Sequence, residues 1–436
     1  MSLPRYPEYQ AAWDEGLREV PASWSVERFS ARTRTHRHSI SPIELDGQSV
    51  FHYSIPAIQD TGTGLVEEGA SIDSSKLLVT EPQLLVSKLN PHKQAVLLAA
   101  HAPGLMTVAS TEFVPLIPTN AHDRYILYVW QSTVCKDYLL ARCDSATRSH
   151  QRVSPQDITK MVWAWPTLAE QSAIAAFLDS ETAKIDALIA EQEKLLALLA
   201  DKRQATISHA VTRGLDPNAP MKDSGIPWLG EVPVHWEIVR LGALLREVDE
   251  PGNDDLPVLS VSIHDGVSDK ELDEKEMDRK VSRSEDRSKY KAVLPGDLTY
   301  NMMRAWQGGF GAVTVAGMVS PAYVVARPTR DLLTSHLEML LRTAGAVTEM
   351  KRYSRGVTDF RLRLYWDEFK TITVALPAKD EQARITAFIW EEVNKFDALG
   401  SEAERAIALL KERRSALIAA AVTGQIDVRG LIEEAA

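Results

Sequence analysis

Two short stretches of this chain carry side chains suited to hydrogen bonding with nucleobases and phosphates. Asparagine, glutamine and arginine can form paired hydrogen bonds with base edges, while lysine and arginine neutralise phosphates. The first stretch contains Lys88, Asn90 and Lys93, and the second contains Asn301, Arg304 and Gln307. Each follows an apolar, strand-like run, so we expect each to be a loop at a strand end. A polar turn capped by a core Trp306 is the alternative for the second stretch.

Basic residues also precede two long segments rich in helix-forming residues. His150 and Arg152 precede the first segment, and Arg361 and Arg363 precede the second. Arg152 and Arg363 occupy equivalent positions when the two halves of the chain are aligned. This equivalence favours a shared contact with phosphates, whereas a solvated charged face is the alternative.

Sequence motifs for catalysis are missing. The chain has no Gly-x-x-x-x-Gly-Lys-Ser/Thr loop for ATP and no dinucleotide-binding glycine fingerprint. Asn90-Pro91-His92 is the nearest fragment to an Asn-Pro-Pro-aromatic amine-methylation motif, and it lacks the second proline. Cys135 and Cys143 have no His or Cys partners at metal-site spacing. We therefore predict a protein that is not an enzyme, with no metal and no cofactor of its own.

The composition is that of an ordinary globular protein. The 436 residues are 44% hydrophobic and 25% charged, which is enough for two or three domains with their own cores. No apolar run reaches about 18 residues, so we expect no membrane span and a cytoplasmic location. The net charge of −11 argues against a surface simply coated with lysine and arginine for nucleic acid.

The chain contains an internal duplication. Pro166–Asp216 aligns without a gap on Pro377–Asp427, and Glu19-Val20-Pro21-x-x-Trp24 matches Glu231-Val232-Pro233-x-x-Trp236. A period of about 211 residues is much longer than a solenoid repeat, so the repeated unit is a domain followed by a helix. The predicted organisation is two mixed α and β domains at 1–165 and 215–376, long helices at 166–214 and 377–425, and a C-terminal tail at 426–436.

Both helical segments show a heptad spacing of apolar residues. Thr167 to Arg213 contains neither Gly nor Pro, and at 1.5 Å per residue it would be about 70 Å long. We expect the two helices to pair as an antiparallel coiled coil that holds the domains apart, with Gly400 as a weak point. The alternative is that each helix packs on its own domain. The predicted pairing residues are Ile185, Leu188, Leu195 and Leu199 with Phe396, Leu399 and Leu410.

The repeated helix motif resembles the DNA-specificity (S) subunit of bacterial type I restriction-modification enzymes. Its pattern is Pro-x-x-x-Glu-Gln-x-x-Ile-x-x-Phe at the start of the helix and Ala-Val-Thr at its end, and it occurs twice. Asp223–Gly230 and Asn301–Gly309 carry the same resemblance, which covers essentially the whole chain. The resemblance implies an α+β fold in which two target-recognition domains, separated by the paired helices, each read half of a bipartite DNA site.

The resemblance also implies partners and roles. Two modification (methyltransferase) subunits would dock on the helices, restriction subunits would be added to cleave double-stranded DNA, and S-adenosylmethionine and ATP would bind those partner subunits. Lys88, Asn90, Lys93, His150 and Arg152 would contact one half-site, and Asn301, Arg304, Gln307, Arg361 and Arg363 the other. Two other functions stay open: a coiled-coil adaptor that does not bind DNA, and a fragment of a fused restriction-methylation enzyme.

Overall fold

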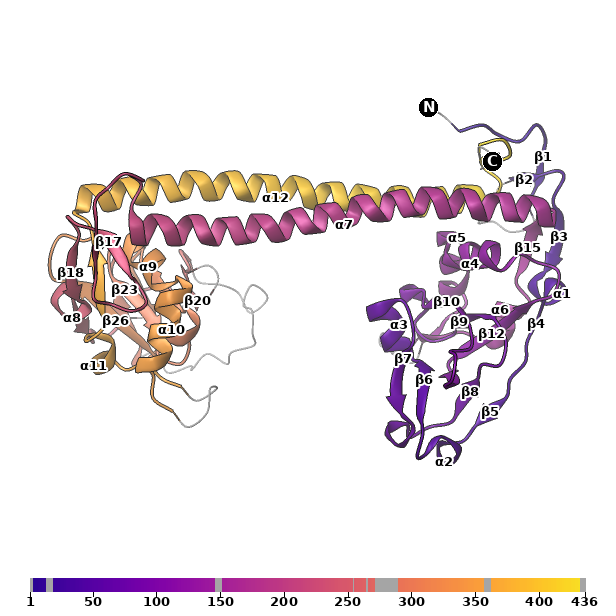
Figure 1. Ribbon diagram of the computed structural model, residues 1–436, viewed down its shortest axis with the longest axis horizontal. Coiled ribbons are helices and arrows are strands. Elements are labelled where there is room, and N and C mark those ends of the chain that lie inside the picture. Colours follow the sequence, from indigo (N-terminus) through magenta and orange to yellow (C-terminus); the bar gives the residue numbers. More distant parts are fainter. Residues whose placement is uncertain are drawn as a thin grey trace. The chain divides into compact units, whose positions relative to one another are not determined.

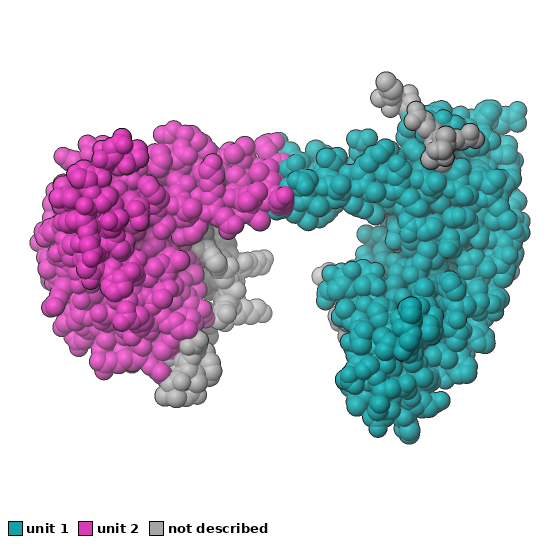
Figure 2. Space-filling view, in the orientation of Figure 1, with its two compact units in different colours: residues 1–193, 404–436 teal, residues 194–403 magenta. Residues whose placement is uncertain are grey.

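The computed structural model describes residues 3–12, 19–145, 151–253, 255–263, 266–270, 289–356 and 362–431. These form two compact units, which Figure 2 shows in different colours. Unit 1 comprises Met1–Glu193 with Glu404–Ala436, and unit 2 comprises Lys194–Ala403. Each unit contains one globular region and part of each of two long helices, α7 (Leu168–Arg213) and α12 (Lys379–Val422) (Figure 1).

The central sheet of unit 1 is antiparallel and has four strands. In spatial order they are β10 (Val96–Ala99), β9 (Gln83–Ser87), β12 (Phe113–Pro118) and β4 (Thr33–Arg34). Pro115 is tolerated inside β12 because it lies opposite Leu85 of β9, whose main-chain groups bond to β10 instead. The helices α4 (Asp123–Gln131) and α5 (Thr133–Leu140) pack beside this sheet.

A second sheet of unit 1 is mixed, because β11 runs parallel to β6 and antiparallel to β8. Its order is β5 (Ser39–Ile40), β8 (Lys76–Leu78), β11 (Met106–Ser110), β6 (Ser49–Tyr53) and β7 (Leu65–Glu68). The remaining elements of unit 1 are short. They are β1 (Tyr9–Ala11), β2 (Glu19–Pro21), β3 (Ser25–Arg28), α1 (Phe29–Arg32), α2 (Pro42–Leu45), α3 (Ile55–Thr61), η1 (Gly69–Ser71), η2 (Pro91–Lys93), β13 (Asp144–Ser145), β14 (Gln151–Arg152), α6 (Pro155–Thr159) and β15 (Val162–Trp165).

Unit 2 is built on a corresponding antiparallel sheet. Its order is β19 (Leu245–Val248), β26 (Tyr323–Pro328), β23 (Leu298–Asn301) and β24 (Phe310–Ala312), with α9 (Thr334–Leu341) and α10 (Ala344–Tyr353) as the counterparts of α4 and α5. The other elements are β16 (Met221–Asp223), β17 (Glu231–Pro233), β18 (Glu237–Arg240), α8 (Leu241–Leu244), β20 (Val261–Ser262), β21 (Gly266–Val267), β22 (Lys291–Val293), η4 (Ala305–Gln307), β25 (Gly317–Val319), α11 (Trp366–Phe369) and β27 (Thr373–Leu376).

The two units share a hydrogen-bond framework. In unit 1, the His122 amide donates to Gln171 Oε1 at 2.8 Å; in unit 2, the Leu333 amide donates to Gln382 Oε1 at 3.0 Å. Leu333 and Gln382 each lie 211 residues after their unit 1 counterparts, His122 and Gln171, which is the period of the duplication. The duplicated Glu-Gln dipeptide therefore fixes the start of each long helix to the globular region that precedes it.

The repeated glycine at the end of each helix packs on the repeated Pro-x-x-Trp segment. Gly424, after α12, has φ +71° and lies so close to Pro21 and Trp24 that a Cβ would clash with Pro21 at 2.4 Å. Gly214, after α7, has φ +77°, and a Cβ there would be 3.5 Å from Trp236. Thus the end of α12 belongs to unit 1 and the end of α7 to unit 2. After α12 the chain continues into the unit 1 core, where Val428 is buried.

The paired helices are antiparallel. In unit 1, Arg414 Nε donates to Asp186 Oδ1 at 2.8 Å. In unit 2, a Cβ on Gly400 would be 3.8 Å from Leu196 Cδ2. As residue numbers rise along α7, the numbers of the contacting residues on α12 fall, as antiparallel packing requires (Figure 1).

Part of the predicted seam is wrong. Leu188, Leu195 and Leu399 are 52%, 39% and 54% exposed, and they lie outside it. The structure places Ile185, Ile189, Gln192, Leu196 and Leu199 of α7, and Phe396, Gly400, Ala403, Ile407 and Leu410 of α12, along the contact. In a heptad repeat, apolar residues can alternate in steps of three then four or of four then three, so two neighbouring columns of side chains both fit the repeat. Only packing against the partner helix determines which column forms the contact. Gly400 therefore faces the partner helix and permits close approach.

No helix in the described ranges is both long and apolar enough to cross a membrane.

Candidate nucleic-acid interface

In unit 1 the two predicted basic stretches lie side by side. Leu89 forms a β-bridge with Arg152, the Asn90 amide donates to Gln151 O at 2.8 Å, and the Gln151 amide donates to Asn90 Oδ1 at 3.2 Å. The structure thus brings Lys88, Asn90 and Arg152 together from stretches more than 50 residues apart. His150 lies outside the described residues.

Glu112 partly neutralises this cluster. Its Oε1 accepts from Arg152 at 3.0 Å, and its Oε2 lies 3.9 Å from Lys88 Nζ. The Arg152 side chain is 59% exposed, so a phosphate could compete with Glu112 for it at little cost. Sequence reasoning missed Glu112 because it comes from the turn before β12, on a different part of the chain.

The turn between β9 and β10 is strained and held in place. Asn90 and Gln94 flank η2 with φ +50° and +45°, and they are the only non-glycine residues with positive φ in the described part of the chain. Gln94 Nε2 donates to Gln131 O at 3.2 Å and Ser132 O at 3.0 Å, at the end of α4. The tip presents exposed His92 and Lys93 to solvent, which fixes where a bound polyanion would meet them.

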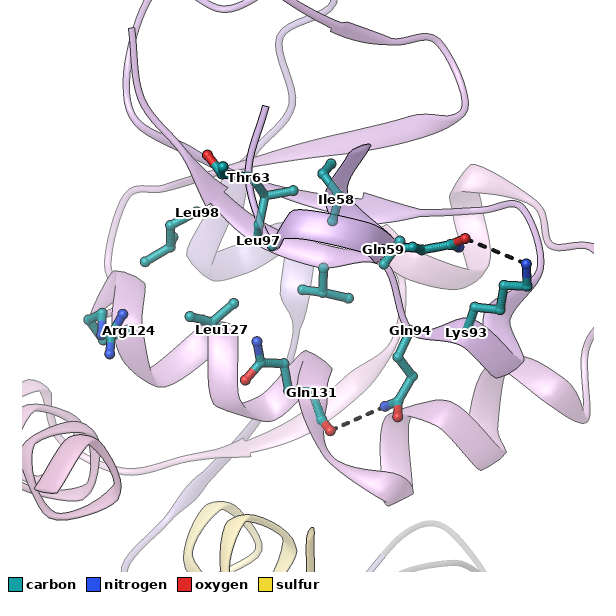
Figure 3. Close-up of a pocket in the computed structure, with 13 residues that line it drawn as sticks. Ile58, Gln59, Thr63, Lys93, Gln94, Leu97, Leu98, Arg124, Leu127 and Gln131 are labelled. Carbon is teal, nitrogen blue, oxygen red and sulfur yellow. Dashed lines mark hydrogen bonds between the residues drawn. The ribbon is translucent and has the colours of Figure 1, made fainter. Parts of the chain in front are cut away.

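Beside this turn lies a groove of about 700 Å³ between α3 and α4 (Figure 3). Apolar side chains line its interior, and polar ones lie along its rim, where Lys93 Nζ is 3.5 Å from Gln59 Oε1. Its apolar residues include Ile58, Leu97, Leu98 and Leu127, and its polar residues include Gln59, Lys93, Gln94, Arg124 and Gln131. No sequence pattern predicts this groove, because its walls come from three separate stretches.

In unit 2 the loop after β23 holds its own side chains in fixed positions. Arg304 Nη1 donates to Gln307 Oε1 at 2.8 Å, and Asn301 Oδ1 accepts from the Met303 amide at 2.9 Å. Trp306 is half-buried and donates to Met303 O at 3.0 Å, while Ala305 is the buried residue of η4. The loop is therefore not capped by a core Trp306, and Arg304 and Gln307 form a preorganised pair of polar groups.

Further cations lie on the segments next to this loop. Lys351 Nζ lies 5.6 Å from the Trp306 ring centroid, and Arg363 pairs with Arg355 through two main-chain hydrogen bonds of 2.9 Å. Arg355 forms an ion pair with Glu368, and Arg352 with Glu349 at 2.7 Å. The predicted contacts did not include Lys351, Arg352 and Arg355, although cations at or just beyond the end of a helix such as α10 are a usable signal. Arg361 lies outside the described residues.

The two loops occupy the same place in their units. The Val153 amide donates to Lys88 O at 3.0 Å, and the Leu364 amide donates to Met302 O at 2.9 Å. Arg152 and Arg363, which precede these amides, are both exposed. The framework is conserved between units while the side chains at the tips differ, so the two loops can recognise different chemical patterns.

No catalytic metal cluster accompanies these loops within the described residues, where no three His, Cys, Asp or Glu side chains gather at a metal-binding distance. Cys135 is buried and Cys143 is half-buried, and no disulfide joins them. Burial raises the pKa of the Cys135 thiol to about 12, so it is an inert core residue at neutral pH.

The chain is similar to known restriction proteins. It is 25% identical over 304 residues to the type I restriction enzyme EcoBI specificity subunit of Escherichia coli, covering 66% of this chain and 63% of that one. It is 23% identical over 283 residues to the EcoKI specificity subunit of Escherichia coli K12, covering 61% and 57%. The chain thus spans about three-fifths of the length of these curated relatives. No protein-family model matches it.

A solved chain from a study of complex assembly and conformational transition in the type I restriction-modification system has the same fold. It matches with a TM-score of 0.67 and 15% identity, covering 93% of this chain and 99% of that one. The predicted resemblance to type I specificity subunits is therefore confirmed. The predicted fold class, mixed helix and sheet with long connecting helices, is confirmed as well.

Proposed function

We propose that this chain is the DNA-specificity subunit of a type I restriction-modification complex, and that each unit reads one half of a bipartite target. The observation that carries the proposal is the shared framework at Lys88 and Met302, which holds two loops of different composition in equivalent places. Two units that share a main-chain framework but carry different side chains suit a DNA target whose two halves differ in sequence. The similarity to curated specificity subunits favours this function over an adaptor or a fragment of a fused enzyme.

Within unit 2, Arg304 is the strongest candidate for reading a base. Its bond to Gln307 orients the guanidinium, and arginine recognises guanine through O6 and N7. Asn301 and Gln307 contribute amides, while Arg363 and Arg361 contact phosphates. Lys351 and Arg355 extend the phosphate contacts along the same face.

Within unit 1, Asn90 is the candidate for reading a base. Its backbone is held in the left-handed region, and its side chain reaches the Gln151 amide. Lys88, Lys93, His150 and Arg152 would contact phosphates. Glu112 would exchange its bond to Arg152 for a phosphate partner on binding, which lowers the net electrostatic gain from this unit.

The partners follow from the exposed apolar residues of the long helices. Leu188 and Leu399 are equivalent positions, as are Leu198 and Leu409, and all four are more than half exposed at 52%, 54%, 56% and 59%. Unit 1 exposes Leu188 and Leu409 in this way, and unit 2 exposes Leu399 and Leu198. Two equivalent sets of exposed leucines suit two copies of one partner. We propose that two modification subunits dock there, that restriction subunits join the complex, and that these partners bring S-adenosylmethionine and ATP. This chain would be non-catalytic and would act in the cytoplasm on double-stranded DNA.

The test is a methylation map. The chain is co-expressed with the modification subunit of its source cell, and modified bases are mapped across the host genome. The expected result is one bipartite motif that disappears when this chain is omitted. Arg304→Ala should relax one position in a single half of that motif, and Arg330→Ala, a surface arginine paired with Glu237, should leave it unchanged. Methylation that does not depend on this chain would overturn the proposal.

A further inference from the structure

Strand β10 of unit 1 forms an edge of its sheet, with β9 on one side only. The Ser87 amide donates to Ala95 O at 3.0 Å, and this bond identifies which residues of β10 are hydrogen-bonded to β9. Ala95, Leu97 and Ala99 therefore bond to β9, and the main-chain N–H and C=O groups of Val96 and Leu98 point away from it. In the described part of the chain, no group bonds to Val96 or Leu98 on that side.

This open edge runs along the groove between α3 and α4 (Figure 3). Leu97 packs with Ile58 of α3 on one side of the strand, and Val96 and Leu98 pack toward Leu127 of α4 on the other. The groove thus combines unpaired main-chain groups with apolar walls above and below. That combination is the physical requirement for adding an extended peptide as another strand.

Unit 2 closes the equivalent edge with its own side chains. The Asn301 amide donates to Gly309 O at 3.1 Å, so the Ala312 amide of β24 points outward, as the Leu98 amide does in β10. Glu338 Oε2 accepts from that Ala312 amide at 2.9 Å, and Arg342 Nη1 donates to Glu338 Oε1 at 2.8 Å. Unit 2 therefore caps an outward-facing amide of its own edge strand.

Unit 1 lacks the residues that provide this cap. The helices α9 and α4 are aligned by their matching bonds to Gln382 and Gln171, so Glu338 corresponds to Leu127 and Arg342 to Gln131. Leucine cannot accept a hydrogen bond, and the Leu98 amide is left without the carboxylate that its counterpart has. An edge left open in one copy and capped in the other indicates an external partner for the open one.

We propose that the β10 edge of unit 1 binds an extended segment of a partner protein, which adds to the sheet as a strand. Its main chain bonds to Val96 and Leu98, its apolar side chains lie against Ile58 and Leu127, and an acidic residue meets Lys93 at the rim. This inference does not rest on the proposed function, since the groove requires no DNA; the two share Lys93 alone, where the acidic residue of the peptide would take the place of a phosphate.

The chemistry of the groove favours peptide over nucleic acid. Ile58, Leu97, Leu98 and Leu127 form the apolar part of its lining, and the second rim cation, Arg124, is already paired with Asp179 through a bond from Nε to Oδ2 of 3.2 Å. A phosphate would therefore meet only Lys93 among the lining cations, whereas a peptide strand would satisfy both outward-facing residues of β10.

The test begins with a phage-displayed library of random ten-residue peptides selected on the immobilised full chain. The most enriched peptide is synthesised with a fluorophore and used as the probe for anisotropy and for amide hydrogen exchange. We expect apolar residues at alternate positions and one acidic residue. Binding should slow exchange at the Val96 and Leu98 amides at least tenfold, and in the free chain Leu98 should exchange at least tenfold faster than Ala312.

Two variants separate this site from others. Leu127→Glu with Gln131→Arg installs the cap of unit 2 and should weaken peptide binding at least tenfold, while Ile43→Glu at an exposed position of α2 should leave it unchanged. Because Leu127 is buried, Lys93→Glu at an exposed position provides a second test and should reverse the preference from acidic to basic peptides. The proposal is overturned if no peptide binds, if binding survives both changes, or if a DNA duplex or a second copy of the chain protects Val96 and Leu98 instead.

Discussion

The indole nitrogen of Trp24 donates a hydrogen bond to Glu170 Oε1 at 3.1 Å, across 146 residues of sequence. Trp236 and Glu381 form the same bond at 3.1 Å in unit 2. Tyr6 also donates to Glu170, at 2.6 Å, and burial together with this carboxylate raises the pKa of the Tyr6 hydroxyl. The most recognisable repeats of the sequence therefore build the junction between each globular region and its helices.

We expect Glu170→Ala to lower the free energy of unfolding of unit 1 by about 2 to 4 kcal/mol. The change leaves two buried donors, on Tyr6 and Trp24, without an acceptor. Urea unfolding followed by tryptophan fluorescence measures the loss. Glu181→Ala, which removes a half-buried carboxylate paired with Lys184 on the same helix, is the matched control. A loss no larger than that of the control would show that the junction does not depend on Glu170.

The stability of unit 2 should depend on pH through His336. This histidine is buried, and neither ring nitrogen has a hydrogen-bond partner within the described residues. Burial lowers its pKa to about 4, against the opposing influence of Glu381. As pH falls, His336 takes up a proton first in the unfolded chain, where its pKa is near 6.5. Its contribution to the free energy of unfolding is therefore intact above about pH 6.5 and is lost as pH falls toward 4.

At pH 5 the expected loss from His336 is about 2 kcal/mol relative to pH 7.5. His336→Leu should reduce the difference in unfolding free energy between these two pH values by that amount, as measured by urea denaturation. His101→Leu, at an exposed position, serves as the control and should not alter the difference. An unchanged pH dependence in His336→Leu would mean that the histidine is protonated within the fold.

Replacing Arg304 with alanine in the assembled complex should affect DNA binding in a different way from replacing Arg363. Loss of a base contact at Arg304 should cost about 1 to 3 kcal/mol and relax one position of the target. Loss of a phosphate contact at Arg363 should weaken binding to all duplexes alike and reduce the slope of log affinity against log salt by about 1. Competition binding on a set of singly mutated duplexes at several salt concentrations distinguishes these outcomes. Equal effects of both changes on specificity would refute the assignment.

The paired helices should set the spacing between the two half-sites. Deleting 192–198 and 403–409 removes one heptad from each helix and keeps both contact faces in register. Each helix would shorten by about 10 Å, which is about 3 base pairs of B-form DNA. Methylation mapping should then show a shorter spacer between unchanged half-sites, or loss of specific methylation because the readers also rotate around the duplex. An unchanged spacer with undiminished methylation would leave the helices as a docking surface alone.

The sequence by itself determined the duplication, the extents of the long helices and the resemblance to specificity subunits. These follow from local signals, because helix formers, glycine stops and repeated motifs act over a few residues. It also located the loops at Asn90 and Arg304 from their strand-end positions. Leu188 and Leu399 were assigned to the helix contact wrongly, since two apolar columns satisfy the same heptad.

Only the tertiary structure decided which side chains meet across long separations. It placed Glu112 between Lys88 and Arg152, brought Trp24 onto Glu170, and selected Ile189 and Leu196 for the contact between the helices. It also showed that Glu338 caps one sheet edge while Leu127 leaves the other open. Such pairings depend on partners contributed by distant segments, and no window of sequence contains both members.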